Sequence, residues 1–221
     1  SDMNASVSTD ELIEQGIPVA IGHRAENIEG ADCIIRTAAA HNDNPEIAAA
    51  RAAGVPVFER AQAWGVIMQN YRNAVCISGT HGKTTTTSMV THILMEAAMD
   101  PTVMIGGTLP LLHSGYRVGQ GDTIILESCE YCNSFLSFYP TVAVILNIEA
   151  DHLDFFKDLD DVEHSFRAFA DLVPQSGTVL ANGEDENTMA ALKGKEDVLT
   201  FGLHHGDFHA ENLTRDHGFP S

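Results

Sequence analysis

The stretch Ile77-Ser-Gly-Thr-His-Gly-Lys-Thr-Thr-Thr-Thr87 predicts the fold of the centre of this chain. It follows an apolar run, 74–77, that is typical of a buried strand, and it leads into 84–97, which is typical of a helix. A strand, a glycine-containing turn, Lys-Thr and a helix are the parts of a phosphate-binding loop. Gly79 and Gly82 allow a tight turn whose N–H groups face an anion, and the positive end of the helix adds to that field.

Two side chains of the loop have expected tasks. Lys83 supplies a full positive charge for the terminal phosphates, and Thr84 supplies a hydroxyl for a Mg²⁺ that bridges them. The strict pattern G-x-x-x-x-G-K-[ST] is longer than Gly79-Thr-His-Gly-Lys-Thr84, which disfavours an ordinary P-loop kinase or GTPase. The competing interpretation is a strand–helix turn that contains an incidental Lys-Thr pair.

The composition limits the size and the partners of the protein. A chain of 221 residues allows one large or two small domains. Its 12 Lys and Arg against 31 Asp and Glu give a formal charge of −19, so we expect neither nucleic acid nor an anionic membrane as a partner. No apolar run approaches the roughly 20 residues that a bilayer requires. The first residues lack the features of a signal peptide, so a cytoplasmic location is expected.

The four cysteines divide into two pairs. Cys33 and Cys76 lie in apolar, strand-like runs and are predicted to be small core residues. Cys129 and Cys132 have the C-x-x-C spacing that also occurs in zinc and redox sites. Because no second C-x-x-C pair follows, we interpret them as ordinary reduced thiols.

The apolar periodicity predicts an α/β fold with a mainly parallel sheet. In an N-terminal domain, 1–71, helices are expected at 7–15, 44–54 and 62–70, and strands at 18–22, 31–36 and 55–58. In a second domain, 72–221, helices are expected at 84–97 and 161–172. Its strands are expected at 74–78, 102–105, 122–127, 141–147, 177–181 and 198–201.

Polar side chains follow two of the predicted strands of the second domain. Glu127 ends one strand, and Asn147, Asp151 and His152 follow another. Because the carboxyl ends of parallel strands meet at one edge, these residues are expected on the same edge as the phosphate loop. His152 is an unusual Mg²⁺ ligand, so a second metal, a phosphate or a turn cap are its alternative roles.

Solvated charges at strand ends are the expected role of two further carboxylates. These are Glu149 and Asp154.

Three stretches together are similar to the Mur ligase family. They are the loop 79–87, the stretch Glu127-Ser-Cys-Glu-Tyr-Cys-Asn-Ser-Phe-Leu136 and the stretch Asn147-Ile-Glu-Ala-Asp-His-Leu-Asp154. Upstream, Gly22-His23, 27–30, 43–46 and 55–57 resemble the family's first domain, so the resemblance covers nearly all of the chain. The short loop is the family's own form.

The resemblance implies a partial Rossmann-like, UDP-sugar-binding domain over 1–71 and a P-loop-type central ATPase domain over 72–221. The family's first glycine-rich loop is expected before Ser1, and its third domain is expected after Ser221. The 221 residues alone are therefore expected not to catalyse the family's reaction.

The resemblance also implies the roles of individual residues. ATP would be bound by Gly79, Thr80, His81, Gly82, Lys83, Thr84 and Thr85, with Asn147 and Glu130 in support. Mg²⁺ would be held by Thr84, Glu127 and His152. The catalytic group would comprise Lys83, Glu127 and His152, and His23 would lie near the uridine diphosphate of the substrate.

The implied reaction is the ATP-dependent joining of UDP-N-acetylmuramate and L-alanine in bacterial peptidoglycan synthesis. A substrate carboxylate would attack the γ-phosphate to give an acyl phosphate, which the amine of alanine would convert into an amide. Three alternatives stay open: a family member that recycles a tripeptide, a nucleotide-binding module without catalysis, and a generic P-loop phosphotransferase.

Overall fold

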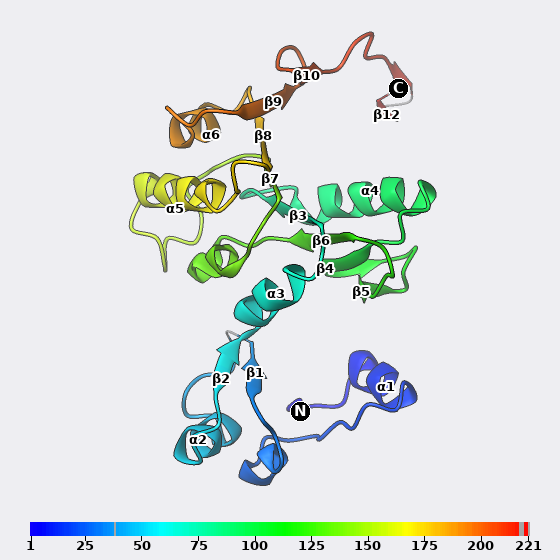
Figure 1. Cartoon of the computed structure of the whole chain (residues 1–221), viewed down its shortest axis with the longest axis vertical. Helices are drawn as coiled ribbons and strands as arrows, with labels where there is room; N and C mark the ends of the chain where they lie inside the picture. The colour runs from blue at the N-terminus through cyan, green and yellow to red at the C-terminus, as the bar shows by residue number, and fades with distance from the viewer. Residues whose placement is uncertain (38, 217–218, 221) are drawn as a thin grey trace. The chain divides into compact units, whose positions relative to one another are not determined.

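The computed structural model describes residues 1–37, 39–216 and 219–220, and the chain forms two compact units (Figure 1). The units comprise residues 1–63 and 64–221, so their division falls inside helix α3 (Arg60–Met68). The sequence places the domain boundary after Tyr71, a few residues further along the chain.

The first unit contains a short β-α-β element. Strand β1 (Ile34–Arg36) pairs in parallel with β2 (Val57–Glu59), and α2 (Pro45–Ala52) connects them. The Asn44 side chain caps α2 by accepting a hydrogen bond from the N–H of Glu46, with Pro45 in the first turn. The unit also contains helix α1 (Val7–Glu14) and the short 3-10 helix η1 (Ala25–Ile28).

Two expectations for this unit are wrong. Residues 18–22 form no strand, and their one ladder contact is a single bridge between Ile21 and Asp2. Pro18 has no N–H to donate, and Gly22 has a φ of +86°, so the segment cannot continue a ladder. Cys33 is exposed because alternation along β1 places it on the same face as the exposed Ile35.

The second unit is built on one eight-stranded sheet with the order β10-β9-β8-β7-β3-β6-β4-β5. Its pairs are parallel except for the antiparallel pair β4–β5. The strands are β3 (Asn73–Ser78), β4 (Thr102–Leu109), β5 (Ser114–Arg117), β6 (Thr123–Glu127), β7 (Val142–Ile145), β8 (Thr178–Asn182), β9 (Val198–Gly202) and β10 (Phe208–His209). The predicted α/β class with a mainly parallel sheet is confirmed.

Four helical segments accompany the sheet: α4 (Lys83–Glu96), η2 (Tyr131–Ser137), α5 (Leu159–Asp171) and α6 (Glu186–Ala191). The short elements β5, α6 and β10 were not predicted. A separate antiparallel pair, β11 (Arg215–Asp216) and β12 (Phe219–Pro220), lies near the end of the chain. In the described part of the chain, no helix combines the length and the apolar character that crossing a bilayer requires.

The strand order places a topological switch point at β3. The connection β3-α4-β4 and the connection β7-α5-β8 run in opposite directions along the sheet, so right-handed crossovers place α4 and α5 on opposite faces. The core beneath α4 includes the fully buried Ile77, Val103 and Ile125. Ligands of open α/β sheets bind at the carboxyl ends of the strands beside such a switch point, here the end of β3.

Helix α4 buries one hydroxyl without a partner. The Thr87 side chain is fully buried, and its oxygen has no hydrogen-bond partner among the described residues. The Thr91 side chain is equally buried, but its hydroxyl donates to the carbonyl oxygen of Thr87 over 2.7 Å. An unpaired buried hydroxyl loses its hydration without compensation.

We therefore expect Thr87→Val to raise the free energy of unfolding by about 1 kcal/mol, because valine has the same shape without the unpaired group. Urea unfolding followed by circular dichroism measures the change. The matched control is Thr91→Val, which removes a satisfied hydroxyl and should leave stability unchanged or lower it. A lower stability for Thr87→Val than for Thr91→Val would contradict this account.

The turn after β9 is organised by the carboxylate of Glu184. Its Oε1 accepts the backbone N–H groups of His204 at 2.5 Å and His205 at 3.0 Å. These hydrogen bonds, of which the one from His204 has the largest effect, lower the pKa of Glu184 from 4.5 to about 2. The folded state therefore favours the ionised carboxylate over the protonated one.

Because the folded pKa is lowered, the stabilisation by Glu184 is present above about pH 4.5 and is lost as the pH falls toward 2. Glu184→Gln should make the free energy of unfolding fall less steeply with decreasing pH in this window. Urea unfolding at a series of acidic pH values tests this. The control is Glu186→Gln, on the same connection and outside this hydrogen-bond set, which should keep the wild-type slope.

Candidate functional site

The loop between β3 and α4 makes a tight turn beside the segment that follows β7. Gly79 and Gly82 have φ values of +142° and +85°, in the region that favours glycine. A Cβ on Gly79 would lie 2.9 Å from Cβ of Leu146, so a larger residue does not fit there. Since α4 begins at Lys83, the N–H groups of its first turn have no acceptor within the helix and are available to an anion.

Asn147 holds this loop from the end of β7. Its Oδ1 accepts the N–H of His81 at 2.7 Å, and its Nδ2 donates to the carbonyl oxygen of His81 at 3.0 Å. Its own carbonyl oxygen accepts the N–H of Thr80 at 3.0 Å. Asn147, which the sequence predicted as a supporting residue, thus fixes the loop backbone at Thr80 and His81 through three hydrogen bonds, and we call this arrangement the clamp.

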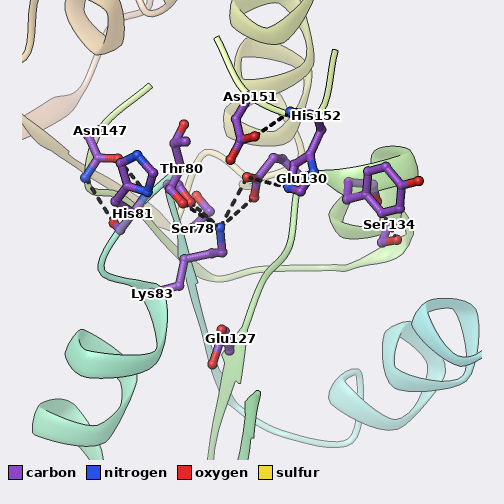
Figure 2. A network of polar contacts seen from close by, with 12 residues as sticks. Ser78, Thr80, His81, Lys83, Glu127, Glu130, Ser134, Asn147, Asp151 and His152 are labelled. Carbon is purple, nitrogen blue, oxygen red and sulfur yellow. Dashed lines mark hydrogen bonds and ion pairs between the residues drawn. The ribbon is translucent and has the colours of Figure 1, made fainter. Parts of the chain in front are cut away.

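Lys83 points toward Glu130, as Figure 2 shows. Its Nζ lies 2.9 Å and 3.2 Å from the two carboxylate oxygens of Glu130, and it also donates to the carbonyl oxygens of Gly79 and Thr80. The Glu130 side chain is only 2% exposed and that of Lys83 14%. A buried carboxylate is costly without a partner, so this ion pair ties the end of β6 to the phosphate loop.

Glu127 has different partners from Glu130. Thr84 donates its hydroxyl hydrogen to Oε1 of Glu127 at 2.8 Å, and the N–H of Gly106 donates to Oε2 at 2.6 Å. A Cβ on Gly106 would lie 2.9 Å from Glu127 Oε1. The pair Gly106-Gly107 within β4 is a sequence signal for such a close approach, and our reading of the sequence missed it.

His152 lies beside Glu130, with Nε2 3.8 Å from Glu130 Oε1. In Figure 2, Glu127 stands apart from these two side chains. The three residues expected to bind metal therefore separate into a Thr84–Glu127 pair and a His152 that faces Glu130. Glu130 lies three positions after Glu127 in sequence, and spacing alone does not reveal which of the two faces His152.

The ring of Tyr131 packs on His152, with ring centroids 4.7 Å apart and an interplanar angle of 40°. Its hydroxyl donates to Oδ2 of Asp154 at 2.9 Å, and this bond raises the pKa of Tyr131 to about 12. The expectation that Asp154 is merely a solvated charge is therefore incomplete. Tyr131 stands next to Glu130 in the resembling motif, but nothing in its sequence context marked it as a partner of His152.

Of the remaining loop residues, His81 and Thr85 are exposed and Thr80 is buried. The Thr80 hydroxyl accepts the N–H of Glu149 at 2.9 Å. The His81 side chain is 63% exposed, and its Nε2 lies 3.6 Å from a carboxylate oxygen of the equally exposed Glu149. Thr85 is exposed on the first turn of α4. The loop thus presents its backbone, Lys83 and Thr84 toward a ligand, with His81 and Thr85 exposed at its surface.

The described residues contain no group of three or more His, Cys, Asp and Glu side chains arranged to hold a metal ion. Cys129 and Cys132 are free cysteines and both residues are exposed overall, while partial desolvation of the Cys129 thiol raises its pKa. Cys76 is buried, as predicted, and its burial raises the pKa to about 12.

His23 lies in the first unit, beside a cavity of about 660 Å³. Its Nδ1 is 3.5 Å from Oε2 of Glu46, and Oε1 of the same carboxylate accepts a hydrogen bond from the side chain of Asn27 at 2.5 Å. Burial alone would raise the pKa of Glu46, but hydrogen bonds from Ser1 and Asn27 lower it overall. Two of the stretches that resemble the family's first domain, His23 and 43–46, therefore line the same hollow.

Two family models match the chain. Residues 1–72 match the model described as Mur ligase family, catalytic domain, and residues 77–220 match the Mur ligase middle domain. The chain is 46% identical over 217 residues to the UDP-N-acetylmuramate–L-alanine ligase of Clostridium botulinum (strain Hall), covering 98% of this chain and 47% of that protein. The chain thus spans about half the length of the curated relatives it matches.

Solved structures show the same likeness. The UDP-N-acetylmuramate–alanine ligase of Thermotoga maritima matches with a TM-score of 0.79 and 31% identity, over 92% of this chain and 46% of that chain. The UDP-N-acetylmuramate:L-alanyl-gamma-D-glutamyl-meso-diaminopimelate ligase from Neisseria meningitides matches with a TM-score of 0.82 and 24% identity. This match covers 93% of this chain and 70% of that chain. The second match is a likeness of fold alone.

The clamp geometry predicts the effect of Asn147→Leu. Leucine has a similar size but makes neither hydrogen bond to the His81 backbone, so the His81 amide should exchange faster with deuterated water. We also expect a loss of about 1–2 kcal/mol in the free energy of unfolding. Amide exchange followed by NMR measures the first effect.

The control for this prediction is His81→Ala, which removes an exposed ring and leaves both backbone hydrogen bonds in place. Exchange at position 81 should stay close to wild type in this variant. Equal exchange rates in wild type and Asn147→Leu would rule out the clamp.

Proposed function

The chain belongs to the Mur ligase family, and on this premise we propose that it serves an ATP-dependent ligase that joins L-alanine to UDP-N-acetylmuramate. The observation that carries the proposal is the arrangement around Lys83. A glycine-containing loop offers backbone N–H groups, a buried cation stands at its end, and carboxylates and an imidazole face it from two neighbouring strand ends. We propose that this is the place of phosphoryl transfer, in the cytoplasm of a bacterium.

The residues present fit the Mg²⁺ that the proposed reaction requires. The Thr84 hydroxyl and the Glu127 carboxylate are oxygen donors 2.8 Å apart, the chemistry that Mg²⁺ prefers. His152, beside Glu130, would hold a second ion. Mg²⁺ commonly takes only one or two protein ligands together with phosphate oxygens and water, so a preformed cage is not required. When bound, the ions would neutralise phosphate charge.

The local charge explains why the cation matters. Lys83 is paired with the carboxylate of Glu130, its neighbour Thr84 is hydrogen-bonded to the carboxylate of Glu127, and the whole chain carries a formal charge of −19. An anionic nucleotide therefore meets little net attraction at the loop without added divalent cations. The proposal accordingly requires nucleotide binding that depends on Mg²⁺.

In the proposed reaction, Lys83 and the loop N–H groups would orient the phosphates and stabilise the charge that develops on the transferred phosphoryl group. The substrate carboxylate would attack that group to give an acyl phosphate and ADP. The neutral amine of L-alanine would then attack the acyl carbon, and phosphate would leave as the amide forms. His23 and its hollow in the first unit would contact the uridine diphosphate of the substrate.

We expect calorimetry to show Mg²⁺-dependent binding of ATP that is weakened at least about tenfold in Lys83→Met/Glu130→Gln. The double variant is needed because Lys83→Ala alone would leave a buried carboxylate unpaired, at a cost of about 3–5 kcal/mol. The control is Lys157→Ala, whose side chain is 85% exposed. ATP affinity that is the same in wild type and the double variant would refute the assignment of the loop.

Turnover separates the alternatives that share this loop. In the full-length protein, ADP release from ATP with UDP-N-acetylmuramate should depend on L-alanine and not on the tripeptide L-alanyl-γ-D-glutamyl-meso-diaminopimelate. Dependence on the tripeptide would favour the recycling ligase, and ATP binding without any amine-dependent ADP release would favour a non-catalytic module.

A further inference from the structure

His152 is held in place by its backbone far more than by the polar contacts of its ring. Its φ is +53°, a conformation that costs a non-glycine residue energy. Its N–H donates to Oδ1 of Asp151, and its carbonyl oxygen accepts the N–H groups of Phe155 and Phe156. The polar neighbour described for the ring is Glu130 at 3.8 Å, which is too long for a hydrogen bond.

The ring of Tyr131 supplies the missing constraint. It packs on the imidazole at 4.7 Å, and it is itself fixed at both ends. Its hydroxyl donates to Asp154 at 2.9 Å, and its ring and that of Phe155 lie in a T-shaped arrangement with centroids 6.1 Å apart. Phe155 in turn packs on Phe156, which is only 2% exposed. Tyr131 is therefore anchored to the segment that carries His152.

We propose that Tyr131, held by Asp154, is a positioning residue that keeps the imidazole of His152 facing Glu130 and the phosphate loop. This inference rests on the proposed function, because it is the role of His152 beside the transferred phosphoryl group that requires a fixed ring. The position of Tyr131 supports it. Tyr131 directly follows Glu130, so one short segment after β6 supplies both the carboxylate and the ring that face His152.

A purely structural role for Tyr131 is the alternative, and a matched pair of variants at Asp154 separates the two. Asp154 is exposed, so its substitution should not prevent folding. Asp154→Ala removes the acceptor of the Tyr131 hydroxyl and frees the ring. Asp154→Asn keeps a side-chain oxygen that accepts the same hydrogen bond. A second pair, Tyr131→Leu and Tyr131→Phe, removes the ring or only its hydroxyl.

The first readout is the proton NMR signal of the His152 ring, assigned with His152→Gln. A ring stacked on tyrosine has its signals shifted upfield by the aromatic ring current. We expect that shift to be reduced in Asp154→Ala, abolished in Tyr131→Leu and retained in Asp154→Asn. An unchanged His152 signal in both Asp154→Ala and Tyr131→Leu would overturn the inference. This readout does not depend on ligase activity, so it tests the contact between Tyr131 and His152 even if the proposed function is wrong.

The second readout is steady-state kinetics of the full-length protein. Misplacing a group beside the reacting atoms lowers kcat, so Asp154→Ala and Tyr131→Leu should lose about 10-fold to 100-fold in kcat with KM for ATP nearly unchanged. Asp154→Asn should restore kcat to within about twofold of wild type. Loss of the NMR shift without loss of kcat would show that the contact is only structural and would overturn the positioning role.

Discussion

The ion pair between Lys83 and Glu130 is the constraint on which the site depends. Both side chains are largely removed from water, so each charge needs the other. Lys83 begins α4 after the short loop that follows β3, and Glu130 follows β6, so the pair forms because these two strands are parallel neighbours with their carboxyl ends at one edge. The parallel pairing of β3 and β6 therefore brings Lys83 and Glu130 together, and their ion pair in turn stabilises that pairing.

Asn147 extends this dependence to a third strand. It follows β7, the other neighbour of β3, and its hydrogen bonds reach the loop backbone and not its side chains. The loop is thus fixed on one flank by an ion pair and on the other by amide hydrogen bonds, while the N–H groups at the start of α4 stay available. Such preorganisation is what a phosphate-binding loop requires, because the donors are aligned before the anion arrives.

The central sheet and the loop could be predicted because their signals are local. The apolar runs of β3, β6 and β7 and the glycines of the loop follow from residue type and spacing alone. The failures have equally definite causes. Residues 18–22 have an apolar composition but contain a proline and a left-handed glycine, and the three-residue strand β1 leaves Cys33 on its exposed face.

The sequence by itself determined that a glycine-containing, lysine-bearing turn joins a buried strand to a helix, and that carboxylates and a histidine follow neighbouring strands. Only the tertiary structure decided which carboxylate belongs to which partner. Glu130 pairs with Lys83 and faces His152, whereas Glu127 binds Thr84 and Gly106. It also brought Tyr131 onto His152. These pairings depend on the strand order, which places β6 and β7 on either side of β3, and on the direction in which the chain leaves each strand, so spacing along the sequence does not reveal them.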